Sequence, residues 1–194
     1  MSADAESVAR AARRLGNPTA IANSLHSMGW ALRREDPEAA LANFEESVAL
    51  LRIGNDNLLD SALGMIAHLR ARQGDLAGAL SALREATEHS ERTGDRPQMV
   101  ATVGFGSLIL ARAGSLEPAA VLAGVVVDGP LAALNNFPGA PRSHADRALS
   151  GLGAALGERE YRAAAARGAA MSYQEVLQFM RAEIDRLLLV EADA

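Results

Sequence analysis

Two series of turn residues alternate along the chain and share one spacing. The first series is built on Gly-Asn and Gly-Asp pairs, whose glycines are 38 and 40 residues apart, at Gly16, Gly54 and Gly94. The second series lies between them, with intervals of 39 and 40 residues, at Asp36, Asp75 and Ser115. Two interleaved series with one period predict a repeat made of two helices joined by short turns.

The segments between these turns carry apolar residues at the three- and four-residue steps of a one-sided helix. The first repeat shows this in both of its segments, with Ile21, Leu25, Met28 and Leu32, then Leu41, Phe44, Val48 and Leu51. We expect one domain that contains a partial repeat over 1–16, full repeats over about 17–54, 55–94 and 95–127, a loop over 128–142, and a helical cap over 143–194.

The third repeat ends in the run "VLAGVVVDGP", whose β-branched residues would also suit a buried strand. The phase of the preceding helix favours a helix that ends at Asp128. In the cap, Ser143 opens a helix, Gly168 is predicted to end another, and Ser172 with Glu175 forms the S-x-x-E box that begins the last one. The apolar stripe of that last helix suits packing within the chain or between two copies.

Composition limits the classes of function. The chain has no cysteine and no lysine, and all 19 basic residues are arginine. Disulfides, thiolate metal sites, a Walker A loop and Schiff-base chemistry are therefore excluded. A net charge of −5 without a basic block disfavours direct nucleic-acid binding, and the sequence lacks an apolar run of membrane-spanning length. We expect a soluble, cytoplasmic, all-α protein.

The sequence contains no pattern typical of a metal, cofactor or catalytic site. Glu85 and His89 are four residues apart, but no second histidine accompanies them, so they are interpreted as a solvated helix face. Carboxylates such as Glu35 and Asp60 are expected at scattered exposed positions, so they form no acid–base pair. We therefore predict that the chain is not an enzyme and binds no cofactor or metal.

A second face of the first helix carries the strongest candidates for recognition. Asn23, His26, Trp30, Arg33 and Arg34 lie apart from the apolar stripe, and the corresponding positions of later repeats are Ser61, His68, Arg72 and Arg112. A groove with tryptophan and arginine suits an acidic peptide or a carboxylate ligand, because arginine binds carboxylates with two parallel hydrogen bonds. The alternative is that Trp30 packs between repeats and the arginines are simply solvated.

Two stretches resemble a known family. The Gly-Asp turn that precedes Ala79 by four residues resembles tetratricopeptide repeats. "SLHSMGWALRREDPEAALANFEESVALLR" and "LGEREYRAAAARGAAMSYQEV" resemble the helical-repeat region that follows the ATPase module in actinobacterial signal-transduction regulators of the LuxR-type, MalT-like and cyclase-linked families. Gly29 and Asp36 are seven residues apart where the tetratricopeptide pattern has eight, which predicts a tighter first turn.

The resemblance implies a right-handed superhelix of antiparallel helix pairs that serves as the sensor or interaction arm of a transcriptional or signalling regulator. The ATPase, DNA-binding or cyclase activity would then reside in other domains. The expected partner is a protein or peptide. A small-molecule effector is the alternative, in which the groove or the loop "NNFPGAPRSH" closes over the ligand. A compact apolar pocket beside Trp30 would favour the effector, and an open polar groove would favour the peptide.

Overall fold

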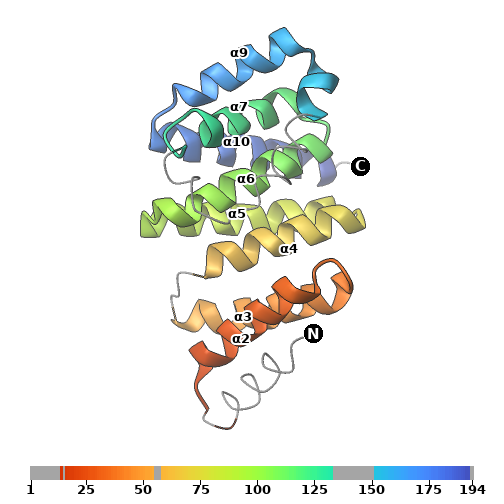
Figure 1. The fold of residues 1–194 in the computed structure, drawn as a ribbon, viewed down its shortest axis with the longest axis vertical. Helices are drawn as coiled ribbons and strands as arrows, with labels where there is room; N and C mark the ends of the chain where they lie inside the picture. The colour runs from red at the N-terminus through yellow and green to blue at the C-terminus, as the bar shows by residue number, and fades with distance from the viewer. Residues whose placement is uncertain (1–13, 15, 55–57, 133–150, 193–194) are drawn as a thin grey trace.

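The computed structural model describes residue 14 and residues 16–54, 58–132 and 151–192. Within these ranges every regular element is a helix, so the all-α prediction is confirmed (Figure 1). The partial repeat predicted over 1–16 and the helix start predicted at Ser143 lie almost wholly outside the described residues.

Six helices follow one another from Pro18 to Val127 and pack in pairs. We name the first helix of each pair an A helix and the second a B helix. The A helices are α2 (Pro18–Leu32), α4 (Leu59–Gln73) and α6 (Arg96–Arg112), and the B helices are α3 (Pro37–Gly54), α5 (Leu76–Thr93) and α7 (Leu116–Val127). The helical interpretation of "VLAGVVV" is thus correct, and its residues from Val121 to Val126 are buried.

The helices begin and end at the residues that the turn pattern marks. The side chains of Asn17, Asp75 and Asp95 each accept a hydrogen bond from the backbone N–H three residues further on, at 3.1, 2.8 and 3.2 Å. Gly74 and Gly94 end α4 and α5 with φ of 89° and 67°, a conformation that residues with a Cβ rarely adopt.

The turn between α2 and α3 is tighter than the two later turns between A and B helices. The Asp36 N–H donates to the carbonyl four residues earlier, at 2.8 Å. The N–H groups of Asp75 and Ser115 donate to the carbonyl five residues earlier, at 3.0 and 2.9 Å. Gly74 and Gly114 supply the positive φ that the longer turn requires, whereas the first repeat has Glu35 before Asp36. The difference agrees with the shorter spacing predicted for the first repeat.

A continuous core runs through the helix pairs, and small residues let the helices approach closely. Phe44 of α3 is 0% exposed and its ring lies against Gly29 of α2, where a Cβ would come within 2.7 Å of it. Phe105 of α6 packs in the same way against Gly64 of α4, at 2.4 Å from the position of a Cβ. Gly29 therefore sets how closely the two helices of the first repeat approach, and Gly64 sets how closely the second and third repeats stack.

Residues 151–156 are helical, as predicted for the helix that begins at Ser143, and α9 (Glu158–Ala169) and α10 (Tyr173–Ala192) follow them. The predicted box at the start of α10 is present: the Ser172 N–H donates to Glu175 Oε2 at 2.7 Å, and the Glu175 N–H donates to Ser172 Oγ at 3.4 Å. Helix α9 packs on α7, whereas α10 returns along α5 and also touches α7 (Figure 1).

The prediction that Gly168 ends its helix is wrong. Helix α9 continues to Ala169, and Gly168 is a buried residue of its last turn. A Cβ on Gly168 would lie 1.9 Å from the carbonyl oxygen of Val121 in α7, and a Cβ on Gly124 would lie 2.0 Å from that of Ala165 in α9. These glycines are therefore needed for the close approach of two backbones, not for a turn.

Candidate functional site

The nine residues predicted for recognition come from the three A helices and the turn after α2. We call the side of the molecule that carries them the A-helix face. Helix α4 packs directly on α6, and the side chains of His26 and Ser61 join α2 to α4, with 3.1 Å between His26 Nε2 and Ser61 Oγ. His68 of α4 continues these contacts to α6, since its ring lies 5.8 Å from that of Phe105. Part of the predicted site thus holds neighbouring A helices together.

His26, Trp30 and Phe44 form an aromatic cluster between α2 and α3. All three ring pairs meet edge to face, with centroids between 5.6 and 6.4 Å apart. The Trp30 indole N–H donates to His26 Nε2 at 3.2 Å. His26 is 9% exposed, while Trp30 is only half-buried. Trp30 therefore packs against His26 and Phe44 within the first repeat, not between repeats, and remains partly exposed.

Arg33 lies over the Trp30 ring. Its guanidinium carbon is 4.9 Å from the ring centroid, and its Nη1 donates to the Trp30 carbonyl oxygen at the end of α2. The arginine thus binds the last turn of its own helix and covers part of the indole. Any ligand that draws the Arg33 guanidinium away would change the surroundings of Trp30.

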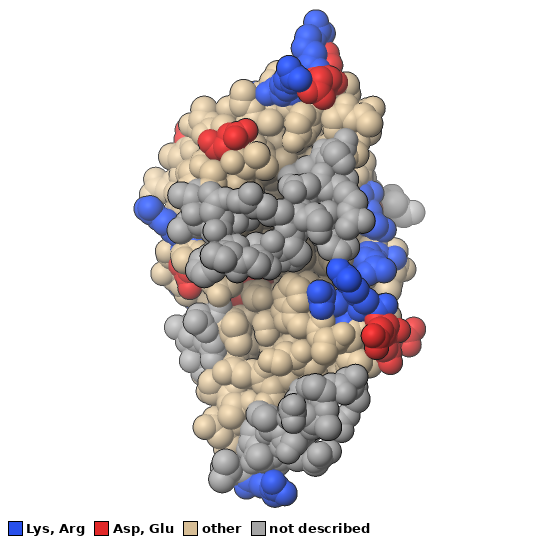
Figure 2. All heavy atoms as spheres, in the orientation of Figure 1, with Lys and Arg blue, Asp and Glu red and all other residues tan. Residues whose placement is uncertain are grey.

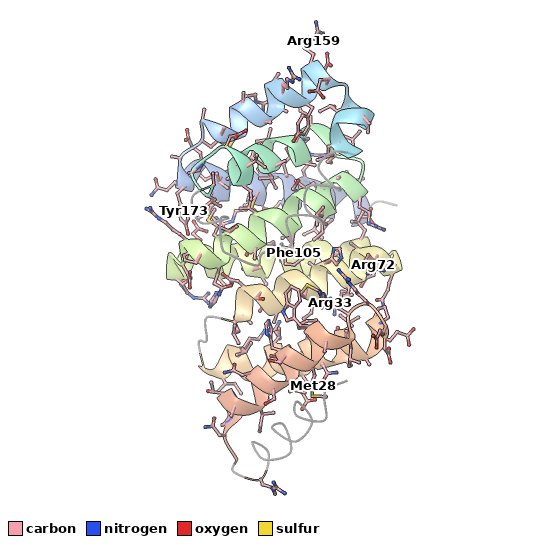
Figure 3. All side chains as sticks on the ribbon, in the orientation of Figure 1. Met28, Arg33, Arg72, Phe105, Arg159 and Tyr173 are labelled. Atoms are coloured by element: carbon pink, nitrogen blue, oxygen red, sulfur yellow. The ribbon has the colours of Figure 1, made fainter. Side chains whose placement is uncertain are left out.

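The other charged members of the A-helix face are exposed at the ends of the A helices. Arg34 follows α2, Arg72 lies in the last turn of α4, and Arg112 is the last residue of α6. Asn23 is exposed near the middle of α2. Figure 3 labels Arg33 and Arg72 close together, and in the same orientation Figure 2 shows basic side chains gathered on that side of the molecule.

The prediction that His89 and Asp60 are exposed is wrong. Asp60 is 1% exposed and His89 is 3% exposed, and 2.6 Å separates Asp60 Oδ1 from His89 Nδ1. Ser90 Oγ donates to the other carboxylate oxygen at 2.7 Å. These residues form a buried polar cluster between α4 and α5. Glu85 points away from it and pairs with Arg52 at 2.6 Å, so Glu85 and His89 share no site.

The buried cluster contains the serine, histidine and aspartate of a nucleophilic triad, but its hydrogen bonds join them in a different order. In such a triad the hydroxyl bonds the histidine and the histidine bonds the carboxylate, which activates the hydroxyl. Here Ser90 and His89 both bond Asp60, so the histidine has no contact through which it could take the serine proton. Among the described residues His89 Nε2 and the Tyr173 hydroxyl are buried without a hydrogen-bond partner.

A signal for this cluster was present in the sequence. Asp60 stands three residues before Leu63, which belongs to the apolar stripe of α4, and His89 stands three residues after Ala86 of α5. Positions three apart lie on the same side of a helix, so a charged residue on that spacing is placed in the core. Its burial then requires a polar partner from a neighbouring helix, which His89 and Ser90 supply.

The environment of Asp60 changes its acidity. Burial raises the pKa of Asp60 above its ordinary value of 3.8, and the hydrogen bonds from Ser90 and His89 oppose this effect. The carboxylate of Asp95, at the start of α6, raises the pKa further. Because the folded state holds this proton more tightly than the unfolded state, Asp60 stabilises the fold below pH 3.8 and loses that contribution as the pH rises through the raised pKa.

Asp60→Asn is therefore expected to change the pH dependence of stability. As the pH rises from 3.8 through the raised pKa of Asp60, the stability of the unmodified chain should fall relative to the variant. Urea unfolding at several pH values measures this difference. The control Glu88→Gln removes an exposed carboxylate of α5 and should leave the change of unfolding free energy with pH as it is in the unmodified chain. If the free energy of unfolding depends on pH in the same way for the unmodified chain and for Asp60→Asn, the prediction is contradicted.

A cleft of about 520 Å³ lies between α7 and α9. It is lined mainly by alanines of α9 together with Gly124, Asp128 and Tyr161. Trp30 is not among its lining residues, so this cleft is not the compact apolar pocket that would favour a small-molecule effector beside Trp30.

Within the described residues, no group of three or more histidine, aspartate or glutamate side chains is placed to hold a metal ion. No described helix combines the length and the apolar character that crossing a membrane requires. Comparisons of the chain with protein-family models, with curated proteins and with solved structures find no match.

Proposed function

We propose that this chain is a non-catalytic helical-repeat module that recognises a segment of a partner protein through its A-helix face. The observation that carries the proposal is the position of α10. This helix packs along α5 and touches α7, and α9 packs on α7, so the B helices of the later repeats are covered. Among the described residues, α2 and α4 pack mainly on repeat helices, whereas α6 also meets α10, with Arg96 over the Tyr173 ring and Met180 beside Gly106.

The composition of the A-helix face also supports recognition of a polypeptide. It combines a half-buried tryptophan, an exposed asparagine and several arginines, which are residue types common at protein interfaces. Trp30 is positioned by Phe44 and His26, so little side-chain entropy is lost when a partner packs against it. A partly pre-organised aromatic residue beside arginines is a suitable anchor for a peptide segment.

The resemblance to actinobacterial LuxR-type, MalT-like and cyclase-linked regulators suggests where such a module would act. In that setting the repeats form a tetratricopeptide-like superhelix that serves as the sensor arm of a cytoplasmic regulator. Binding of a partner to the A-helix face would then be the signal that reaches the catalytic or DNA-binding domains of the regulator. This part of the proposal rests on the two resembling stretches.

The proposal is tested by site-specific photo-crosslinking in cells that produce the protein naturally. A photoreactive phenylalanine analogue at Asn23 places the crosslinker on an exposed position of α2, and the same analogue at Ala49 places it on an exposed position of α3. We expect a discrete protein adduct from position 23 that is absent from position 49. Identical adduct patterns from the two positions, or an adduct from position 49 alone, would show that the A-helix face is not the binding surface.

A further inference from the structure

Three arginines occupy the same place in three successive repeats. Arg33, Arg72 and Arg112 each stand three residues before the residue that caps the following B helix, at intervals of 39 and 40 residues. Each therefore lies where an A helix ends. We call these three residues the arginine row. Helices α4 and α6 pack directly on each other, whereas α2 packs mainly on α3 and is joined to α4 by the contact between His26 and Ser61.

A structural explanation exists for each arginine alone. The carbonyl end of a helix carries a partial negative charge, and a cation there stabilises the helix by about 0.3–1 kcal/mol. That effect explains why an arginine is favoured at a helix end. It does not determine whether the same arginine also forms an ion pair with a carboxylate. In ion pairing, the arginine row differs from most of the other described arginines.

Most of the other arginines in the described part of the chain are paired with a carboxylate. Eight of them form an ion pair with a carboxylate among the described residues, namely Arg52, Arg70, Arg84, Arg159, Arg162, Arg167, Arg181 and Arg186. No member of the arginine row has a carboxylate partner in the described part of the chain. Arg14, Arg92 and Arg96 also lack one there, but they stand outside the row.

Carboxylates do lie near the row in the sequence, but they make other contacts. Asp36 accepts a hydrogen bond from the Ala39 N–H at 3.0 Å, and Asp75 accepts one from the Gly78 N–H at 2.8 Å. Arg70 also approaches Asp75, at 3.9 Å. The carboxylates therefore cap the B helices, and the row remains available in a protein whose net charge is −5.

We infer that the arginine row binds an acidic peptide that carries carboxylates at intervals of about 10 Å. This inference rests on the proposed function and names the chemistry of its partner. Packed helices lie about 8–10 Å apart, so Arg72 and Arg112, on the packed helices α4 and α6, present their charges at a similar spacing. A peptide in the polyproline II conformation repeats its side-chain direction every three residues, over about 9 Å. Glutamates at every third position would therefore meet successive arginines.

The chain contains its own reporter for this binding. Trp30 is its only tryptophan, and the Arg33 guanidinium lies 4.9 Å from the centroid of its ring. A carboxylate that pairs with Arg33 changes the position or the charge of the guanidinium beside the indole. Binding should therefore change the Trp30 fluorescence in a saturable way.

The experiment titrates the full chain with a peptide of Glu-Pro-Pro repeats, which favours polyproline II, and follows Trp30 emission. A peptide of Gln-Pro-Pro repeats tests whether the carboxylates matter, and oligouridylate tests whether any polyanion suffices. We expect Arg72→Gln and Arg112→Gln each to weaken binding of the glutamate peptide about fivefold, with the double variant weaker still. Binding should also weaken as salt rises.

The matched control is the double variant Arg159→Gln and Arg162→Gln, which removes two exposed charges from α9. It should bind the glutamate peptide as the unmodified chain does. Equal losses in the control, equal binding of the glutamine peptide, or stronger binding of oligouridylate would each overturn the inference. If the crosslinker at position 23 captures a partner while the glutamate peptide fails to bind, the acidic-peptide inference fails and the proposed function stands.

Discussion

Gly168→Ala is expected to lower the free energy of unfolding by about 3 kcal/mol, the upper end of what overpacking usually costs. The added Cβ would lie 1.9 Å from the carbonyl oxygen of Val121, and that oxygen belongs to the backbone of α7. A side chain could rotate away, but a helix backbone moves only as a unit. The substitution must therefore push α9 away from α7 and open the contact between them.

Gly124→Ala should have a similar effect from the opposite helix, because its Cβ would meet the Ala165 carbonyl oxygen at 2.0 Å. Gly104→Ala is the matched control. Gly104 also lies within a helix, but no atom of a neighbouring element lies within 4 Å of the position of a Cβ. Alanine there should stabilise the chain by about 0.5–1 kcal/mol, because it restricts the unfolded backbone.

Thermal and urea unfolding distinguish these cases. For a chain of this size a loss of 3 kcal/mol corresponds to a decrease in Tm of about 6–12 °C. The two contact variants should show this decrease and Gly104→Ala should not. If Gly168→Ala and Gly104→Ala change Tm alike, α7 and α9 are not packed backbone against backbone.

Ile184→Asp should detach α10 from the repeats, at an expected cost of about 4 kcal/mol or more. Ile184 is 0% exposed and belongs to the apolar side of α10, together with Val176, Met180 and Leu187. The substitution removes buried apolar surface and places a carboxylate where no described cation is buried to meet it. Since α10 packs along α5, its release also uncovers the apolar side of that B helix.

Gln178→Asp is the control for this prediction, because it introduces the same charge at an exposed position of the same helix. Urea unfolding should give a much lower midpoint for Ile184→Asp than for Gln178→Asp. A dye that fluoresces on exposed apolar surface should bind only the Ile184 variant under native conditions. Equal midpoints and equal dye binding would mean that α10 contributes little to the stability of the repeats.

Local signals in the sequence were sufficient for the helices of the repeats and for several of their ends. Asn17 and Asp75 cap their helices because their own side chains reach the backbone N–H groups three residues on, which depends on no distant contact. The apolar stripes that include Leu63 and Leu83 were also recognised, since helical spacing alone assigns them to one side. In the candidate site, the exposed ends of the A helices could be predicted in the same way.

The interior of the candidate site could not be predicted residue by residue. His26 looked like a groove residue but bonds Ser61 of the next A helix, and Asp60 looked exposed but bonds His89 and Ser90 of α5. In each case the deciding partner is 29 to 35 residues away along the chain. Periodicity places a side chain on a face of its helix, but it does not say which helix will cover that face.

The sequence by itself determined that this chain is helical, where its helices begin, and that its arginines recur with the period of the repeat. The first two properties depend on hydrogen bonds and spacing within a few residues, and the recurrence of Arg33, Arg72 and Arg112 is visible in the sequence directly. Only the tertiary structure decided that Gly168 is a contact residue and that α10 returns to α5. It also decided that Arg72 and Arg112 remain without a carboxylate among the described residues, because ion pairing and close packing depend on which helices become neighbours.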